Sequence, residues 1–173
     1  MAGSMQEIKL SQGYVALVDD HDYERVNKYK WSVIVIKRKD GTIRTQYASG
    51  TLKSVDGKYR AVRMHRFIVG CAEGLQVDHI DGNGLNNLRE NLRICSNNQN
   101  QYNQRPRTNG SSRFKGVSWH KNEKVWQATI KFNGRQTWLG QFNSEERAAM
   151  AYNEAARRMF GEFALLNIVC EAC

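Results

Sequence analysis

Residues 77–100, VDHIDGNGLNNLRENLRICSNNQN, place one histidine beside an aspartate and follow the pair with many asparagines. A carboxylate next to an imidazole suits phosphodiester hydrolysis, because the carboxylate can hold a divalent cation on the phosphate while the imidazole deprotonates water. Adjacent residues of a strand point to opposite faces, so Asp78 and His79 can share one site only where the chain bends. The DGNG sequence at residues 81–84 permits that bend.

Three short elements would bring further amides to this pair. LQVDHI predicts a strand, DGNGLNNLRE a turn-rich loop, NLRIC a second strand, and SNNQNQYNQ the start of a helix with the capping-box spacing of Ser96 and Gln99. Asn91 lies 12 residues past His79 at the start of the second strand, and Asn100 lies 9 residues further on in the helix. Two antiparallel strands crossed by a helix would place His79, Asn91 and Asn100 together.

This order of elements, with D-H, N and N at these spacings, resembles the HNH nuclease family with its ββα-metal fold. It is most similar to the phage branch of homing endonucleases, in which the last position is Asn. The resemblance implies that His79 is the general base and that Asn91 holds the loop and orients the His79 ring. Asp78 and Asn100 would be the ligands of one Mg²⁺ or Mn²⁺ ion, which prefers oxygen donors.

Other residues of this segment have less specific roles. His65, in MHRFIVG, matches a histidine often found upstream in this branch, as either a phosphate contact or a structural hydrogen bond near the catalytic strand. We expect most of the remaining amides to be structural, because Asn favours tight loops and helix starts. These amides are Asn83, Asn86, Asn87, Asn97, Asn98 and Asn103.

The region before this segment predicts a small antiparallel β-meander. Its β-rich runs are separated by KDGT and VDGK, and Asp-Gly between such runs indicates a hairpin. A short helix is expected in DDHDYERVNKYKW, with His21 as a surface histidine in its acidic first turn. The meander either contacts DNA or carries scattered surface charge through one basic set: Lys37, Arg38, Lys39, Arg44, Lys53, Lys58, Arg60 and Arg63.

The C-terminal region predicts three strands, in FKGVSWH, VWQATIKFN and RQTWLGQF, and then an amphipathic helix that ends at Gly161. The helix has one apolar stripe, formed by Ala149, Tyr152, Ala156 and Met159. In the middle strand, alternation predicts a face that packs on this helix, formed by Trp126, Ala128, Ile130 and Phe132. The opposite face, with Gln127, Thr129 and Lys131, is free to meet a partner.

The C-terminal pattern resembles the AP2 DNA-binding domain through the markers KGV, WLGQF, AYNEAA and FALLN. The resemblance implies a three-stranded sheet that reads the major groove of double-stranded DNA. Its matching positions predict a DNA face of Lys115, Ser118, His120, Thr129, Lys131, Gln136 and Trp138; the alternative is a solvated surface. Several of these positions are arginine in the plant domains, so the plant target sequence does not transfer. The basic linker RPRTNGSSR would follow the DNA backbone through Arg105, Arg107 and Arg113.

Composition supports a polyanionic partner and limits the alternatives. The 173 residues carry a net charge of +9, and residues 105–135 hold eight basic residues against one acidic residue. The sequence has no apolar run of about 18 residues, which excludes a membrane-spanning segment. For Cys71, Cys95, Cys170 and Cys173 we expect free thiols and no structural zinc; a zinc site through a lone C-x-x-C is the alternative.

Together these features predict an α+β chain: an N-terminal antiparallel β-meander, a central ββα-metal motif, and a C-terminal three-stranded sheet packed on one helix. The predicted organisation is a cloning remnant (1–4), a β-rich DNA-contacting region (5–64), an HNH catalytic module (65–104), a basic linker (105–113), an AP2-like domain (114–169) and a tail (170–173).

The predicted function is a metal-dependent, site-specific DNA endonuclease that nicks one strand as a monomer, with a dimer as the alternative. It would act in the cytoplasm of a phage-infected bacterial cell. A DNA-binding regulator of AP2 type with an inert HNH-like segment is the competing hypothesis. An RNA-binding protein is a third, although a sheet that reads the major groove favours duplex DNA.

Overall fold

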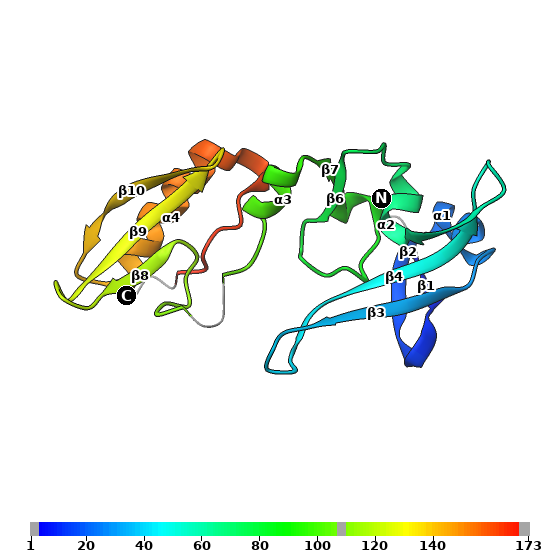
Figure 1. Cartoon of the computed structure of the whole chain (residues 1–173), viewed down its shortest axis with the longest axis horizontal. Coiled ribbons are helices and arrows are strands. Elements are labelled where there is room, and N and C mark those ends of the chain that lie inside the picture. Colours follow the sequence, from blue (N-terminus) through cyan, green and yellow to red (C-terminus); the bar gives the residue numbers. More distant parts are fainter. Residues whose placement is uncertain (1–3, 107–109, 170–173) are drawn as a thin grey trace. The chain divides into compact units, whose positions relative to one another are not determined.

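The computed structural model describes residues 4–106 and 110–169, and the chain divides into two compact units, residues 1–97 and 98–173 (Figure 1). Both units are mixed α and β with antiparallel sheets, which confirms the predicted α+β class. Arg107, Cys170 and Cys173 fall outside the described residues. Within the described ranges, none of the helices has the length and apolar character needed to cross a membrane.

The first unit begins with a β-hairpin and a short helix. Strands β1 (Met5–Lys9) and β2 (Val15–Asp19) pair antiparallel around η1 (Ser11–Gly13). Helix α1 (Asp20–Asn27) follows directly, and Asp20 and Asp22 lie in its first turn, where the helix dipole favours acidic residues. Val26 of this helix is completely buried.

The predicted meander is present as β3 (Trp31–Lys37), β4 (Ile43–Lys53) and β5 (Tyr59–Arg63), in the order β3-β4-β5. Gly41 and Gly57, at the two predicted Asp-Gly turns, adopt φ of 83° and 80°. That conformation favours glycine and explains why the turns form there. The inner face of the sheet supplies Trp31, Val33 and Ala48 to the core of the unit.

Helix α2 (Met64–Val69) closes this core, and the hairpin of β6 (Gln76–His79) and β7 (Leu92–Cys95) follows it. The long loop between β6 and β7 ends in η2 (Arg89–Asn91). The backbone of this loop is bound to β2, because Leu17 N donates to Leu85 O at 2.9 Å and Asn87 N donates to Leu17 O at 2.8 Å. The hairpin is therefore built into the first unit.

Helix α3 (Asn97–Tyr102) completes the predicted order of strand, loop, strand and helix. All of its residues except Asn97 belong to the second unit. The ring of Tyr102 stacks on Phe160 with centroids 4.0 Å apart, and its backbone oxygen accepts hydrogen bonds from Lys115 Nζ and Leu165 N. The end of α3 is thus part of the core of the second unit, whose compact body starts before the predicted linker.

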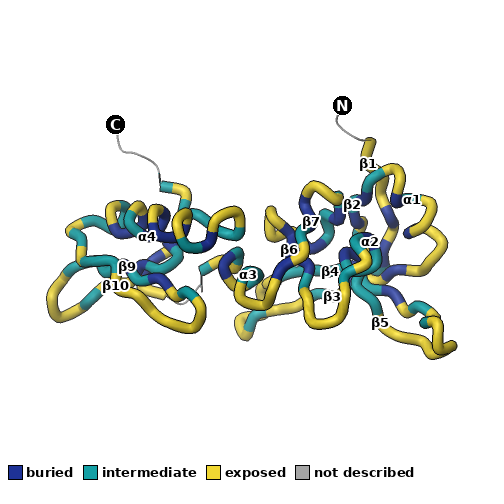
Figure 2. The backbone as a smooth tube through the Cα atoms, turned by 90° about the horizontal axis from the view of Figure 1, so that it is seen from above, coloured by how far each residue is buried: buried dark blue, intermediate teal, exposed yellow. Residues whose placement is uncertain are grey.

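The second unit contains the predicted three-stranded sheet, with β8 (Val117–His120), β9 (Val125–Phe132) and β10 (Arg135–Phe142) in the order β10-β9-β8. Helix α4 (Glu145–Phe160) packs on this sheet through small residues and Tyr152. Ser144 caps the helix by accepting Arg147 N, and Gly161 ends it with φ of 55°, before η3 (Gly161–Phe163). Figure 2 shows buried residues concentrated in the helices and strands of each unit.

Candidate nuclease site and DNA-binding face

Asp78 is the first of the predicted metal ligands, and it is held by an arginine on the neighbouring strand. Antiparallel pairing places Asp78 opposite Arg93, and the Asp78 side chain is nearly buried. Arg93 Nη2 and Nε both donate to Asp78 Oδ2, at 2.7 and 3.0 Å. Hydrogen bonds between charged partners are strong, so Arg93 fixes the orientation of this carboxylate.

His79, the predicted general base, ends β6 and is only 4% exposed. Its Nε2 lies 3.4 Å from Asn87 Oδ1. Burial lowers the pKa of His79 below its usual value, against the opposing effects of the Asn87 hydrogen bond and of the Asp81 and Asp78 carboxylates. The ring is therefore neutral at physiological pH, which is the state that a general base requires.

His65 lies in α2 and packs against His79. The two rings are edge to face, with centroids 4.9 Å apart, and Tyr47 of β4 contacts both of them. Burial lowers the pKa of His65 to about 3, with smaller contributions from His79 and from the nearby arginines Arg63 and Arg66. His65 is therefore neutral at physiological pH, and in that state a phosphate contact would be a hydrogen bond from its ring N–H. Among the described residues, nothing hydrogen-bonds to its buried Nδ1.

Asn91 holds the loop between the two strands. Its Oδ1 accepts Asp81 N at 3.0 Å, and its Nδ2 donates to Asp81 Oδ1 at 3.0 Å and to Asn86 O at 2.8 Å. Ile80 N also donates to the backbone oxygen of Asn91. These contacts tie Asn91 to the loop, and its role in orienting His79 stays a prediction. The side chain described at His79 Nε2 is that of Asn87, through its acceptor Oδ1.

Asn87 is a residue that the sequence did not single out. It is completely buried, although asparagine in a loop is usually exposed. Its Nδ2 donates to Leu85 O at 3.1 Å, which leaves its Oδ1 directed at His79. The only sequence signal was the doubled asparagine at residues 86–87, which cannot reveal which of the two turns inward.

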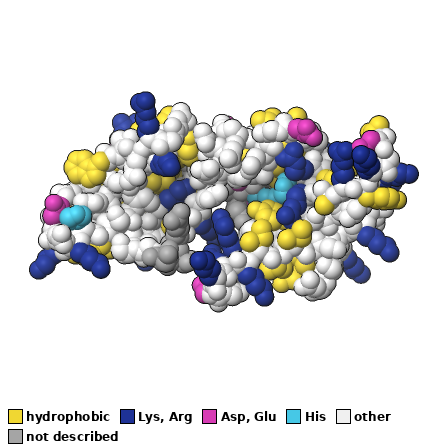
Figure 3. Space-filling model, viewed as in Figure 1, with side chains coloured by type: hydrophobic (Ala, Val, Ile, Leu, Met, Phe, Trp, Pro, Cys, Tyr) yellow, Lys and Arg dark blue, Asp and Glu magenta, His cyan; other side chains and the backbone are white. Residues whose placement is uncertain are grey.

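The loop also touches the meander at Gly84. A Cβ at this position would lie 2.1 Å from Gln46 O and 2.6 Å from the ring of Tyr47, so only glycine allows the close approach. Because Tyr47 contacts both histidines, β4 forms one wall of the site. Figure 3 shows histidine atoms reaching the surface near β6, beside lysine or arginine and hydrophobic side chains.

Asn100, the second predicted metal ligand, is half-buried on α3 in the second unit. Its assignment as a ligand stays a prediction. The chemistry of the predicted donor set fits the expected ion, because a carboxylate and an amide both offer oxygen, the donor that Mg²⁺ and Mn²⁺ prefer.

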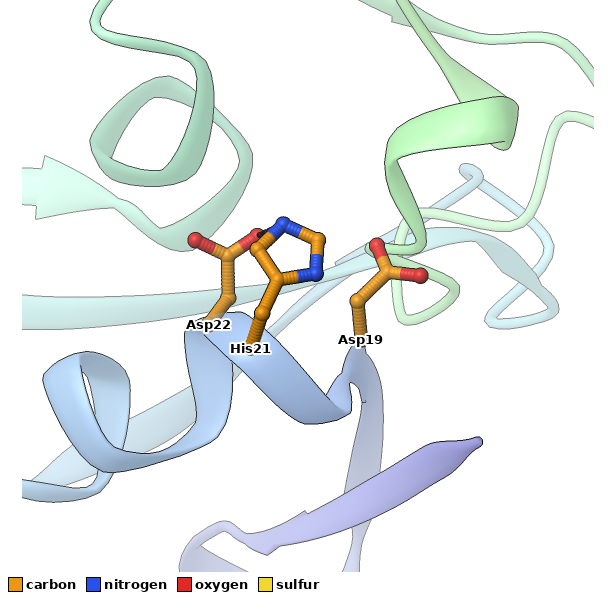
Figure 4. Close-up of side chains that lie close together, drawn as sticks. All are labelled: Asp19, His21 and Asp22. Carbon is orange, nitrogen blue, oxygen red and sulfur yellow. Dashed lines mark ion pairs between the residues drawn. The ribbon is translucent and has the colours of Figure 1, made fainter. Parts of the chain in front are cut away.

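A separate group of side chains has the composition of a metal site, but its carboxylates already accept hydrogen bonds from arginines. Asp19, His21 and Asp22 gather at the end of β2 and the first turn of α1 (Figure 4). Asp22 is buried, and both of its oxygens accept from Arg89, at 2.7 and 3.0 Å, while Arg25 adds a bond of 2.7 Å. Arg89 N also donates to Asp19 Oδ2. Asp19 and Asp22 therefore fasten the end of the β6–β7 loop to β2 and α1.

In the second unit, strand register places most predicted DNA-contacting residues on one face of the sheet, opposite α4. Thr129 pairs with Trp138 and Lys131 with Gln136, while Ser118 and His120 lie on the same side of β8. Trp138 is 61% exposed, which is unusual for so large an apolar side chain. The register adds Gln127 and Gln141 to this face; Gln141 was not predicted.

Lys115 differs from the other predicted DNA contacts. It precedes β8 and its Nζ donates to the backbone oxygen of Tyr102, at the C-terminal end of α3, where a cation is favourable. Burial lowers the pKa of Lys115 to about 8. Lys115 is therefore engaged within the unit, whereas Arg105 and Arg113 are exposed to solvent, Arg113 with Glu146 at 3.8 Å.

The comparisons with known proteins identify both parts of the chain. The profile of the HNH endonuclease family matches residues 64–102, and the AP2 domain profile matches residues 112–162. The chain thus combines a nuclease-type domain with a domain of a DNA-binding class, as the two resemblances indicated.

Two viral relatives extend over most of the chain. Protein 3.8 of Escherichia phage T7 is 32% identical over 117 residues, which cover 65% of this chain and 96% of that protein. The uncharacterized HNH endonuclease L560 of Acanthamoeba polyphaga mimivirus is 35% identical over 163 residues, 90% of this chain and 76% of that protein. The chain belongs to the HNH endonuclease family.

The AP2 part has relatives of its own. Dehydration-responsive element-binding protein 2E of Oryza sativa subsp. japonica is 42% identical over 65 residues, 35% of this chain and 19% of that protein. No solved structure matches the chain significantly.

Proposed function

We propose that this protein is a divalent-metal-dependent, site-specific endonuclease of homing type, which hydrolyses phosphodiester bonds in double-stranded DNA. It would act in the cytoplasm of a phage-infected bacterial cell. One observation carries the proposal: a buried, neutral His79 is held in place beside Asp78 in a segment that matches the HNH endonuclease profile. One such site per chain would cut one strand, so a monomer produces a nick.

The proposed reaction is an in-line displacement at phosphorus. His79 takes a proton from a water molecule, the water oxygen forms a bond to phosphorus, and the bond from phosphorus to the 3′ oxygen breaks. The leaving oxygen takes a proton from solvent, which gives a 3′-hydroxyl and a 5′-phosphate. Asp78 and Asn100 would hold one Mg²⁺ or Mn²⁺ ion, whose charge stabilises the phosphate and the leaving oxygen.

The Arg93 contact has a consequence for this assignment. Arg93 already donates two hydrogen bonds to Asp78 Oδ2, so the carboxylate would be shared between the arginine and the ion. The proximity of a guanidinium favours weak metal binding, since like charges repel. It also means that Asp78 is oriented before any ion arrives.

The AP2 sheet would supply sequence-specific binding. Its face opposite α4 combines the exposed Trp138 with Lys131 and several amide or hydroxyl side chains that can donate to base edges. The exposed Arg105 and Arg113 would contact phosphates at the edge of this domain.

A nicking assay tests the proposal. Purified protein is incubated with a library of supercoiled plasmids that carry phage and host DNA fragments, with Mg²⁺ or Mn²⁺, and the new ends are mapped by primer extension. We expect open circles without linear product, and loss of cleavage with a chelator. His79→Ala should lower the cleavage rate by about 100-fold or more.

A matched control is available in the same unit. His21 is a histidine whose side chain is 64% exposed, so His21→Ala should cleave like the wild type. Full cleavage by His79→Ala, with divalent metal present, would remove His79 from the mechanism.

The competing function is a DNA-binding regulator with an inert nuclease segment. The Arg93 contact on Asp78 is the observation that favours it, because the carboxylate already has a cationic partner. Specific binding to a mapped site, without cleavage in any divalent cation, would support the regulator over the nuclease.

A further inference from the structure

We propose that Asn87 is a positioning residue that fixes the tautomer of His79, with the proton on Nε2 and the reactive lone pair on Nδ1. The inference rests on the proposed function and goes beyond it by naming the nitrogen that takes the proton from water. It also assigns a role to a side chain outside the four motif positions Asp78, His79, Asn91 and Asn100.

The orientation of the Asn87 amide is set by its own hydrogen bonds. Its Nδ2 donates to Leu85 O at 3.1 Å, and a carbonyl oxygen can only accept. The opposite end of the amide, Oδ1, is therefore the end that meets His79 Nε2, at 3.4 Å. Because Oδ1 can only accept, the hydrogen of this bond has to be on Nε2.

Neutral imidazole carries one ring proton, so a protonated Nε2 leaves Nδ1 without one. A general base abstracts a proton with its unprotonated nitrogen. The ring nitrogen presented to water in the reaction is accordingly Nδ1. The partner of the other nitrogen commonly sets the tautomer of a functional histidine, and here that partner is an amide.

The surrounding chain keeps Asn87 in place. The residue is completely buried, so solvent does not compete for its amide. Its backbone N donates to Leu17 O on β2, and Leu17 N donates to Leu85 O, so both ends of the short segment are bound. The close approach of Gly84 to Gln46 and Tyr47 restrains the same loop on its other side.

The charged and titratable groups near the ring have other described partners. Asp81 accepts hydrogen bonds from Asn83 N, Asn86 and Asn91, and Asp78 accepts from Arg93. His65 contacts the ring of His79 edge to face. The positive charges of Arg63 and Arg66 help to lower the pKa of His65. The uncharged amide of Asn87 thus orients the ring without placing a counter-charge on Nε2.

The tautomer can be measured without metal or cleavage. Long-range ¹H–¹⁵N spectra of the full-length metal-free protein are recorded at about pH 8, above the usual histidine pKa, and the His79 signals are assigned by their loss in His79→Ala. We expect an Nε2 with the shift of a protonated nitrogen and an Nδ1 with the shift of an unprotonated one. The reverse pattern in the wild type would overturn the proposal, whatever any variant does.

Variants then connect the tautomer to the rate. Asn87→Ala should give a mixed or reversed tautomer and lower the single-turnover cleavage rate by about 10- to 100-fold, with unchanged DNA affinity. The matched control is Asn83→Ala, because the exposed Asn83 bonds to Leu85 N in the same loop without touching His79. It should keep both the wild-type spectrum and the wild-type rate.

The outcomes separate this proposal from the proposed function. A wild-type tautomer or a wild-type rate in Asn87→Ala would refute the role of Asn87 while leaving the nuclease intact. Full cleavage by His79→Ala would instead refute the nuclease mechanism, and the spectra would still report whether Asn87 orients the ring.

Discussion

Replacing Tyr102 should destabilise the second unit, although this residue lies in the helix that completes the nuclease motif. The ring is 9% exposed and stacks on Phe160, with an interplanar angle of 7°. Replacing a buried aromatic ring with alanine costs about 3–5 kcal/mol, because apolar packing is removed and a cavity remains. We expect Tyr102→Ala to lower the stability of the second unit by this amount.

Tyr102→Phe isolates the contribution of the hydroxyl. That group donates to Asn133 Oδ1 at 3.1 Å and accepts from Asn133 N at 3.3 Å, in the turn between β9 and β10. A hydrogen bond contributes about 0.5–1.5 kcal/mol. Because Asn133 is exposed and can bond to water instead, the two bonds together should be worth about 1 kcal/mol.

Urea unfolding followed by tryptophan fluorescence measures these changes, since Trp119, Trp126 and Trp138 lie in the second unit and Trp31 in the first. Tyr59→Ala is the control, because Tyr59 is 71% exposed in the first unit and should leave this transition unchanged. An unchanged transition in Tyr102→Ala would refute the conclusion that α3 is anchored in the core of the second unit.

Three further predictions test other parts of the structure. Asp22→Ala should cost about 2 kcal/mol in thermal unfolding, less than for a fully buried pair because its arginine partners are half-exposed. The hydrogen bonds from Arg89 and Arg25 outweigh the effect of burial and lower the pKa of Asp22 below 3.8. The contribution of Asp22 to the free energy of unfolding is therefore present above pH 3.8 and is lost as the pH falls through the pKa of the folded state. Equal acid sensitivity of the wild type and Asp22→Ala would contradict this. Gly84→Ala should destabilise by about 1–3 kcal/mol because its Cβ would overlap Gln46 O, and an unchanged melting temperature would show that the loop is not packed there. Lys131→Ala and Trp138→Ala should each weaken binding to a mapped DNA site by about 1–3 kcal/mol for every base contact that the substitution removes. Unchanged gel-shift affinity of both variants would remove the face of the AP2 sheet opposite α4 from the proposal.

Local patterns predicted the elements of this fold well. Alternation along β9 identified the buried Ala128 and Ile130 and the outward Thr129 and Lys131, since successive residues of a strand face opposite sides. The Asp-Gly pairs marked the turns of the meander, and the small residues of α4 marked its buried stripe. These signals depend on neighbours along the chain, so one sequence is sufficient to read them.

The partners of the site residues were harder to predict, because they come from distant parts of the chain. Arg93 was not expected at Asp78, and Arg89 was not expected to bond to Asp22, 67 residues away. Asn87 looks in the sequence like any turn-forming asparagine. Its burial follows from the docking of the loop on β2, which no local pattern records.

Docking of the β6–β7 loop on β2 has a consequence for how the HNH motif of this chain can be inherited or engineered. The hydrogen bonds between Leu17 and the segment that contains Leu85 and Asn87 make the first hairpin of the chain a structural neighbour of the β6–β7 hairpin. A recombination event that transferred residues 64–102 alone would leave this loop without its backbone partner and the histidine without a rigid support. Successful exchange between genes should therefore carry the N-terminal strands together with the motif.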